Sequence, residues 1–145
     1  MPYVPFYQYL PAIAQMETRV ITLPSSKNEF GLPAGEYAFV ELFCDECDCR
    51  RVFFNVINRD FTEPVAVITW GWESKQFYIK WFRSNDKDAI EQMMGSGLSM
   101  LSKQSAIAPK VLGMFNKVLL KDNAYTVRVK RHYDLFRNML KKIQR

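Results

Sequence analysis

Hydrophobic and polar residues follow two different rhythms along the chain, and the change comes near residue 83. Before it, short runs of aromatic and β-branched residues alternate with turn-forming residues, which is typical of β-strands. After it, apolar residues recur at steps of three and four, which is typical of helices that bury one face. The pattern therefore predicts strands in the first part of the chain and helices in the second.

The first part predicts five strands joined mostly by short turns. A loop rich in proline, glycine and small polar residues, 24–35, separates the first strand from the second. The turn DECD would make a hairpin in which Cys44 faces Cys49 and Val40 faces Phe53. Successive hairpins give an antiparallel meander. The expected strands are 18–23 (TRVITL), 36–44 (EYAFVELFC), 49–58 (CRRVFFNVIN), 65–72 (VAVITWGW) and 76–82 (QFYIKWF).

The second part predicts three to four helices. A short one follows the N-cap candidates at 84–86, and the glycines of 95–97 interrupt it. A second covers 98–106, and Pro109 suits the first turn of a third that runs to about Leu120. The last helix covers 124–144. The expected fold is a single α+β domain, 1–145, with a sheet of about five strands over 18–83 and C-terminal helices over 85–144.

Composition agrees with one globular domain. The chain has 145 residues, of which 48% are hydrophobic, enough for a core. Its apolar runs are far shorter than the roughly 20 residues of a membrane helix. The aromatic N-terminus lacks the basic region of a signal peptide and is broken by prolines. We therefore expect a cytoplasmic protein with no membrane partner, whose N-terminal aromatic residues cover the sheet or form a contact in an oligomer.

The strongest chemical signal is the stretch FCDECDCRRVFFNV, which holds all three cysteines of the chain. In a reducing compartment such a cluster indicates metal binding or catalysis before a disulfide. Zinc prefers thiolate and imidazole ligands in a tetrahedron, and a Cys-x-x-Cys turn directs two sulfurs to one ion. The sequence predicts a structural zinc site at Cys44, Cys47 and Cys49, with the single histidine, His132, as the candidate fourth ligand.

Other interpretations of the cysteines stay open at this point. Cysteine packs like a small hydrophobic residue, so all three can be ordinary buried thiols. Cys44 and Cys49 can form a cross-strand disulfide, and His132 can be a core histidine bonded to the backbone. The fourth ligand can also come from water, a second chain, or the acidic residues Asp45, Glu46 and Asp48.

Positive charge is concentrated at the C-terminal end. From residue 117 onward there are nine Lys and Arg against two Asp, a charge of +7. The rest of the chain has eleven cationic and thirteen anionic residues and carries −2. Such a helix can bind nucleic acid or an acidic protein, or can be an ordinary solvated surface. The candidate phosphate contacts are Arg128, Arg131, Lys142 and Arg145.

With one histidine, the chain lacks most of the known acid–base motifs of enzymes. We therefore expect a non-enzymatic binding or adaptor domain with a structural zinc site. Two alternatives remain: nucleic-acid binding through the basic last helix, and a metal- or thiol-dependent enzyme.

Overall fold

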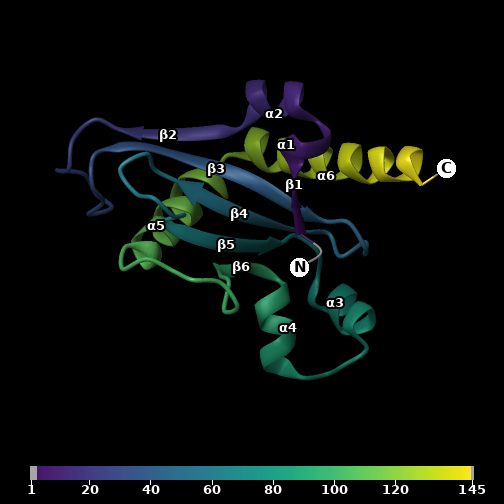
Figure 1. The fold of residues 1–145 in the computed structure, drawn as a ribbon. Helices are drawn as coiled ribbons and strands as arrows, with labels where there is room; N and C mark the ends of the chain where they lie inside the picture. Colours follow the sequence, from purple (N-terminus) through teal and green to yellow (C-terminus); the bar gives the residue numbers. More distant parts are fainter. Residues whose placement is uncertain (1–2, 145) are drawn as a thin grey trace.

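The computed structural model describes residues 3–144 and shows an α+β fold. A six-stranded antiparallel sheet has helices on one face and at its ends (Figure 1). The elements are β1 (Tyr3–Pro5), α1 (Phe6–Tyr9), α2 (Pro11–Glu17), β2 (Arg19–Leu23), β3 (Gly35–Cys44), β4 (Arg51–Ile57), β5 (Ala66–Gly71), α3 (Lys75–Phe82), α4 (Lys87–Met93), β6 (Gly95–Leu98), α5 (Ala108–Met114), a π-helical turn (Phe115–Leu119) and α6 (Asn123–Ile143).

The sheet is largely a meander, as predicted. Strands β3, β4, β5 and β6 are neighbours in chain order, and every pair is antiparallel. Strands β1 and β2 both lie on the outer edge of β3. β2 pairs with residues 35–39 and β1 with residues 42–44. The aromatic N-terminus therefore does cover a sheet edge, and α1 and α2 connect the two short strands.

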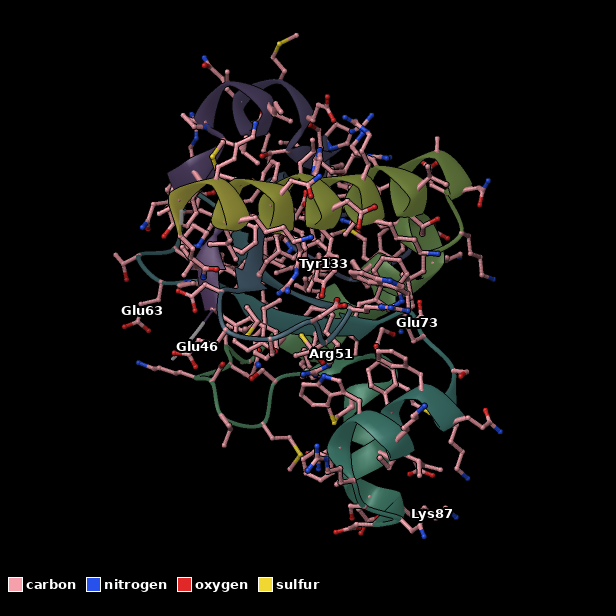
Figure 2. The ribbon with its side chains drawn as sticks, turned by 90° about the vertical axis from the view of Figure 1, so that its right-hand side faces the viewer. Glu46, Arg51, Glu63, Glu73, Lys87 and Tyr133 are labelled. Carbon is pink, nitrogen blue, oxygen red and sulfur yellow. The ribbon has the colours of Figure 1, made fainter. Side chains whose placement is uncertain are left out.

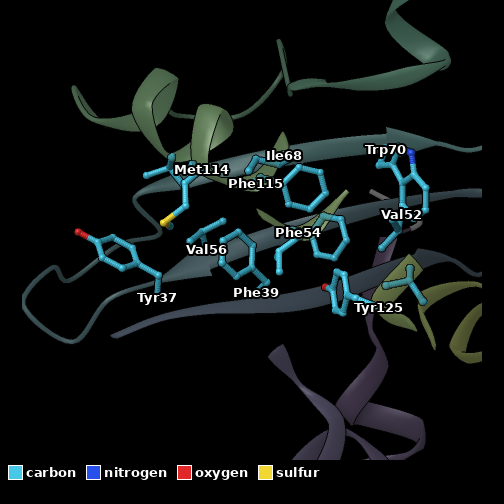
Figure 3. Close-up of a cluster of buried hydrophobic side chains, with 14 of the residues drawn as sticks. Tyr37, Phe39, Val52, Phe54, Val56, Ile68, Trp70, Met114, Phe115 and Tyr125 are labelled. Carbon is cyan, nitrogen blue, oxygen red and sulfur yellow. The ribbon is translucent and has the colours of Figure 1, made fainter. Parts of the chain in front are cut away.

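The core lies between one face of the sheet and the helices α5 and α6 (Figure 3). Alternate strand residues point to this face, and Phe115 of the π-helical turn packs among them. Its ring centre is 5.9 Å from that of Phe39 and 5.0 Å from that of Phe54. The apolar stripe of α6 covers the end of the same face, where Phe43 contacts Tyr133 and Phe136. This stripe is the one predicted from the spacing of apolar residues.

The prediction of a strand at 76–82 is wrong, because this segment is helix α3. Ser74 caps the helix by accepting a hydrogen bond from the backbone N–H of Phe77. Only Tyr78 is fully buried, and its hydroxyl donates to the backbone carbonyl of Arg50. The dense aromatic residues resemble a strand, but the cap and this one long-range contact favour the helix.

The predictions for 95–106 are also wrong. The glycine-rich segment does not separate two helices but forms the edge strand β6, which pairs with β5. The helix expected at 98–106 is a loop, in which the side-chain amide of Gln104 bonds to both backbone groups of Val67. Gln104 therefore continues the hydrogen bonding of the sheet where β6 has ended. No helix within residues 3–144 is long and apolar enough to cross a membrane.

Candidate functional site: the cysteine turn and its surroundings

The cysteines lie where β3 is joined to β4: Cys44 is the last residue of β3, and Cys47 and Cys49 belong to the turn at residues 45–50. The turn is two residues longer than predicted, because Leu42 rather than Val40 faces Phe53. Cys44 therefore does not face Cys49, and the predicted pairing of these two cysteines across the hairpin is wrong. The shift by two residues keeps the same side chains on the buried face of the sheet. The extra length lets the turn fold back on itself, with Cys44 and Cys49 buried and Cys47 partly exposed.

The three thiols gather at this turn. The sulfur atoms of Cys44 and Cys47 are 2.6 Å apart, and all three cysteines are free. The backbone N–H of Glu46 donates to the Cys44 sulfur at 3.4 Å. On the other side, the Tyr3 hydroxyl from β1 lies 3.9 Å from the Cys49 sulfur. The spacing of the cysteines in the sequence did predict that their sulfurs come together, although it predicted a different pairing of β3 with β4.

Burial disfavours the charged form of these thiols. It raises the pKa of Cys47, and the neighbouring thiols of Cys44 and Cys49 raise it further. Burial also raises the pKa of Cys49, while hydrogen bonds from Cys47, Tyr3 and the Arg51 backbone lower it in part. At neutral pH these two thiols are therefore protonated and weak as nucleophiles. A cation bound among the sulfurs would lower the pKa of these thiols and favour their charged form.

The turn ends in a strained residue that is held from both sides. Arg50 is not a glycine, yet it has a φ of 51°. Its N–H donates to the Tyr133 hydroxyl of α6 at 3.0 Å, and its carbonyl accepts from Tyr78 of α3 at 2.9 Å. The Tyr133 hydroxyl in turn donates to Asp48. Figure 2 views this end of the sheet, where Tyr133, Arg51 and Glu73 lie between α6 and the helices α3 and α4.

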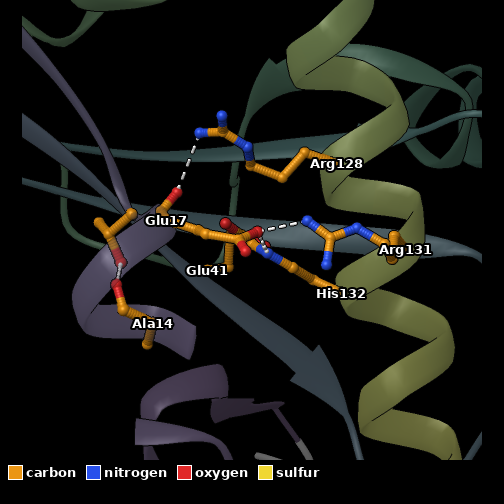
Figure 4. A network of polar contacts seen from close by, with 7 residues as sticks. Ala14, Glu17, Glu41, Arg128, Arg131 and His132 are labelled. Carbon is orange, nitrogen blue, oxygen red and sulfur yellow. Dashed lines mark hydrogen bonds and ion pairs between the residues drawn. The ribbon is translucent and has the colours of Figure 1, made fainter. Parts of the chain in front are cut away.

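The structure does not bring His132 to the cysteines. Its ring is fully buried, and each nitrogen faces a carboxylate: Nδ1 lies 2.7 Å from Glu41 and Nε2 lies 2.8 Å from Glu17 (Figure 4). Phe6 stacks on the ring with centres 4.5 Å apart. His132 thus joins α6 to β3 and to the end of α2. Sequence reasoning missed both of its partners.

These carboxylates change the protonation of the histidine. Burial alone would lower the pKa of His132, but hydrogen bonds and charge from Glu41 and Glu17 outweigh it and raise the pKa. Burial raises the pKa of Glu41 despite the histidine beside it. The hydrogen bond with His132, aided by Arg131, lowers the pKa of Glu17, which is partly exposed. The cluster suits an imidazolium that donates from both nitrogens.

The basic residues predicted to contact phosphates differ in their surroundings. Arg128 donates to the backbone carbonyl of Glu17, and Arg131 pairs with the Glu17 carboxylate. These two arginines hold α2 against α6. Lys142 is exposed near the end of α6, and Arg145 lies outside the described residues.

No group of three or more His, Cys, Asp or Glu side chains within residues 3–144 has the arrangement that would hold a metal ion as it stands. One detail of the turn does bear on cation binding. Oδ1 of Asp45 is buried without a hydrogen-bond partner among the described residues. A buried acceptor of this kind is normally paired.

No known family model, curated protein or solved structure matches the chain.

Proposed function

We propose that the chain is a non-enzymatic binding domain whose cysteine turn holds one zinc ion through Cys44, Cys47 and Cys49. The observation that carries the proposal is the convergence of all three thiols at one end of the β3–β4 hairpin. Zinc takes thiolate ligands readily, and structural sites with three cysteines are common. Free thiols of this kind imply a reducing compartment, so we also propose that the chain works in the cytoplasm.

The fit to zinc requires one movement. With Zn–S bonds of about 2.3 Å, two sulfurs of a tetrahedral site lie about 3.8 Å apart. Those of Cys44 and Cys47 are 2.6 Å apart, so they must separate by about 1 Å. Cys47 is partly exposed and can turn outward. The backbone N–H groups of Glu46 and Arg51 already bond to the sulfurs of Cys44 and Cys49, which favours thiolates.

The fourth ligand in this proposal is Asp45 or water. Asp45 follows Cys44 directly, and its buried oxygen lacks a partner within the described chain. His132 is a poor candidate because both of its ring nitrogens face carboxylates. The zinc would be structural, since it would join the end of β3 to the start of β4. The chemistry of an enzyme is less well supported, because burial raises the pKa of the Cys47 and Cys49 thiols and the histidine is enclosed.

The test is metal content and thiol state of the protein purified without added metal or a histidine tag. We expect about one zinc per chain by mass spectrometry, and three thiols that react only after a chelator is added. Cys49→Ser should lose the zinc. Two controls should keep it: Glu46→Gln, which changes an exposed side chain of the same turn, and His132→Phe.

Two results would overturn the proposal. One is a protein that takes up no zinc from a buffered excess and has three freely reactive thiols. The other is an intact mass two hydrogens too low with one titratable thiol, which would mean a Cys44–Cys47 disulfide. The short distance between those sulfurs makes the second result the one that the mass measurement must exclude first.

A further inference from the structure

A polar groove of about 620 Å³ lies between α6 and the cysteine turn. One wall is a face of α6, and the other is formed by the turn and the residues that follow β5. Trp72 lies in the groove with its ring centre 5.1 Å from that of Tyr133. The residues that line the groove are Asp48, Arg50, Trp72, Glu73, Lys130, Tyr133, Asp134, Arg137, Asn138 and Lys141.

Arg50 neutralises part of the negative charge in the groove. Asp48 and Glu73 both form ion pairs with Arg50, at 3.8 and 3.5 Å. The guanidinium of Arg50 also lies over the ring of Phe77, 4.7 Å from its centre. Asp134 is the third carboxylate in the lining, so the whole groove, with four cationic residues, has a formal charge of +1.

The positive charge on the α6 wall is not neutralised in this way. Lys130, Arg137 and Lys141 form no ion pair within residues 3–144, although Arg137 donates to the backbone carbonyl of Cys47. They stand at intervals of seven and four residues on one side of the helix. At a rise of about 1.5 Å per residue, the row is about 16 Å long. With Asp134 among them, this wall carries a net charge of about +2.

We propose that this groove binds single-stranded nucleic acid, with the phosphates along Lys130, Arg137 and Lys141 and a base against Trp72. Single strands are held by a positive groove that follows the backbone and by aromatic side chains on which bases stack. The row is long enough for several nucleotides. The site differs from the one expected from sequence, because Arg128 and Arg131 are engaged by Glu17 on another side of the helix.

The groove and the zinc proposal are separate, although the cysteine turn forms part of one wall. The three cationic residues lie on α6, and of these Arg137 also bonds to the backbone carbonyl of Cys47. The test changes only the two lysines and leaves the cysteine turn intact, so its outcome is distinct from that of the zinc measurement.

The test is fluorescence anisotropy of a labelled 12-nucleotide single strand of RNA or DNA at increasing salt. Three phosphate contacts predict a slope of about −2 in a plot of log affinity against log salt. The double variant Lys130→Gln/Lys141→Gln should lower affinity about tenfold or more and reduce the slope to about −0.7. The matched control, Lys87→Gln/Lys121→Gln, removes two exposed lysines outside the groove and should change neither.

Two further variants give results of different kinds. Asp134→Asn removes the one carboxylate in the row and should tighten binding severalfold. Trp72→Phe should weaken binding and leave the salt slope unchanged, because it removes stacking area and no charge. Equal losses in the groove and control double variants would overturn the proposal. Polyglutamate that competes as well as the unlabelled single strand would also overturn it and would indicate an acidic protein partner. A duplex of the same sequence that binds as tightly as the single strand would overturn it too.

Discussion

The buried contact between His132 and Glu41 allows a prediction with a definite size and pH dependence. Glu41 is 4% exposed, and His132 is its one hydrogen-bond partner among the described side chains. The substitution His132→Phe keeps an aromatic ring against Phe6 and removes that partner. Breaking a buried pair on one side typically costs about 3–5 kcal/mol, because the other charge stays buried without compensation.

Protonation of Glu41 sets an upper limit to this cost. A glutamate with an ordinary pKa of about 4.3 can be neutralised at pH 7 for about 3.7 kcal/mol, at about 1.4 kcal/mol per pH unit. The variant should therefore lose about 3–4 kcal/mol at pH 7 and only about 1 kcal/mol at pH 5. The double variant His132→Phe/Glu41→Leu should regain most of the loss, since it leaves no buried charge.

Urea unfolding followed by tryptophan fluorescence between pH 5 and 8 measures these differences. The wild-type protein should behave in a related way, because the pKa values of His132 and Glu41 are both raised on folding. The folded state then binds more protons than the unfolded state, so stability falls as the pH rises through the raised pKa values. The stability that each group contributes is fully present below the ordinary pKa that the group has in the unfolded chain. The reasoning would be refuted if His132→Phe lowered the unfolding free energy by less than about 1 kcal/mol at pH 7. It would also be refuted if the loss were the same at pH 5 and at pH 7.

Four other substitutions test the backbone and the core, and each is measured as a change in unfolding free energy. Gly71→Ala should cost more than about 2 kcal/mol, because a Cβ there would lie 2.0 Å from the backbone oxygen of Met93. In contrast, Gly113→Ala should stabilise α5 by about 0.5–1 kcal/mol, since its Cβ meets no atom within 4 Å; a similar result at both glycines would contradict the explanation. Arg83→Gly should be neutral or stabilising by up to about 1 kcal/mol, because Arg83 ends α3 with a φ of 56°. Phe115→Ala should cost about 3–5 kcal/mol by leaving a cavity between the sheet and the helices, and a loss below about 1 kcal/mol would contradict that packing.

The sequence predicted the elements whose pattern is local and repeated. The strand at 36–44 and the last helix each show the correct period over many residues, and both were confirmed. The segment at 76–82 was misassigned because its aromatic residues suit either structure. Its helix depends on the cap at Ser74 and on contacts of Tyr78 with Arg50, about thirty residues away. Strand β6 could not be predicted because GSGL has no strand propensity and forms only against β5.

The turn length shows a different limit of sequence reasoning. A four-residue hairpin loop is the simplest connection for DECD, yet the turn has six residues. What extends it is the attachment of Arg50 to Tyr133 and Tyr78, two side chains from helices that follow much later in the chain. The local sequence pattern does not show that Arg50 is held by two distant tyrosines, so the turn length could not be predicted. The pattern does show which strand residues face the core, and that prediction is unaffected by the longer turn.

The contact of His132 with Glu41, in contrast, did have a signal in the sequence. Glu41 occupies the inward-facing parity of β3, between Phe39 and Phe43, and His132 interrupts the apolar stripe of α6. A group that can carry charge is costly on a buried face unless a partner of opposite sign meets it. One acid and one base, each interrupting a face that must be buried in the same core, are therefore best explained by each other. The same reasoning argues against His132 as the ligand of a distant metal, because the charge of Glu41 would then have no partner.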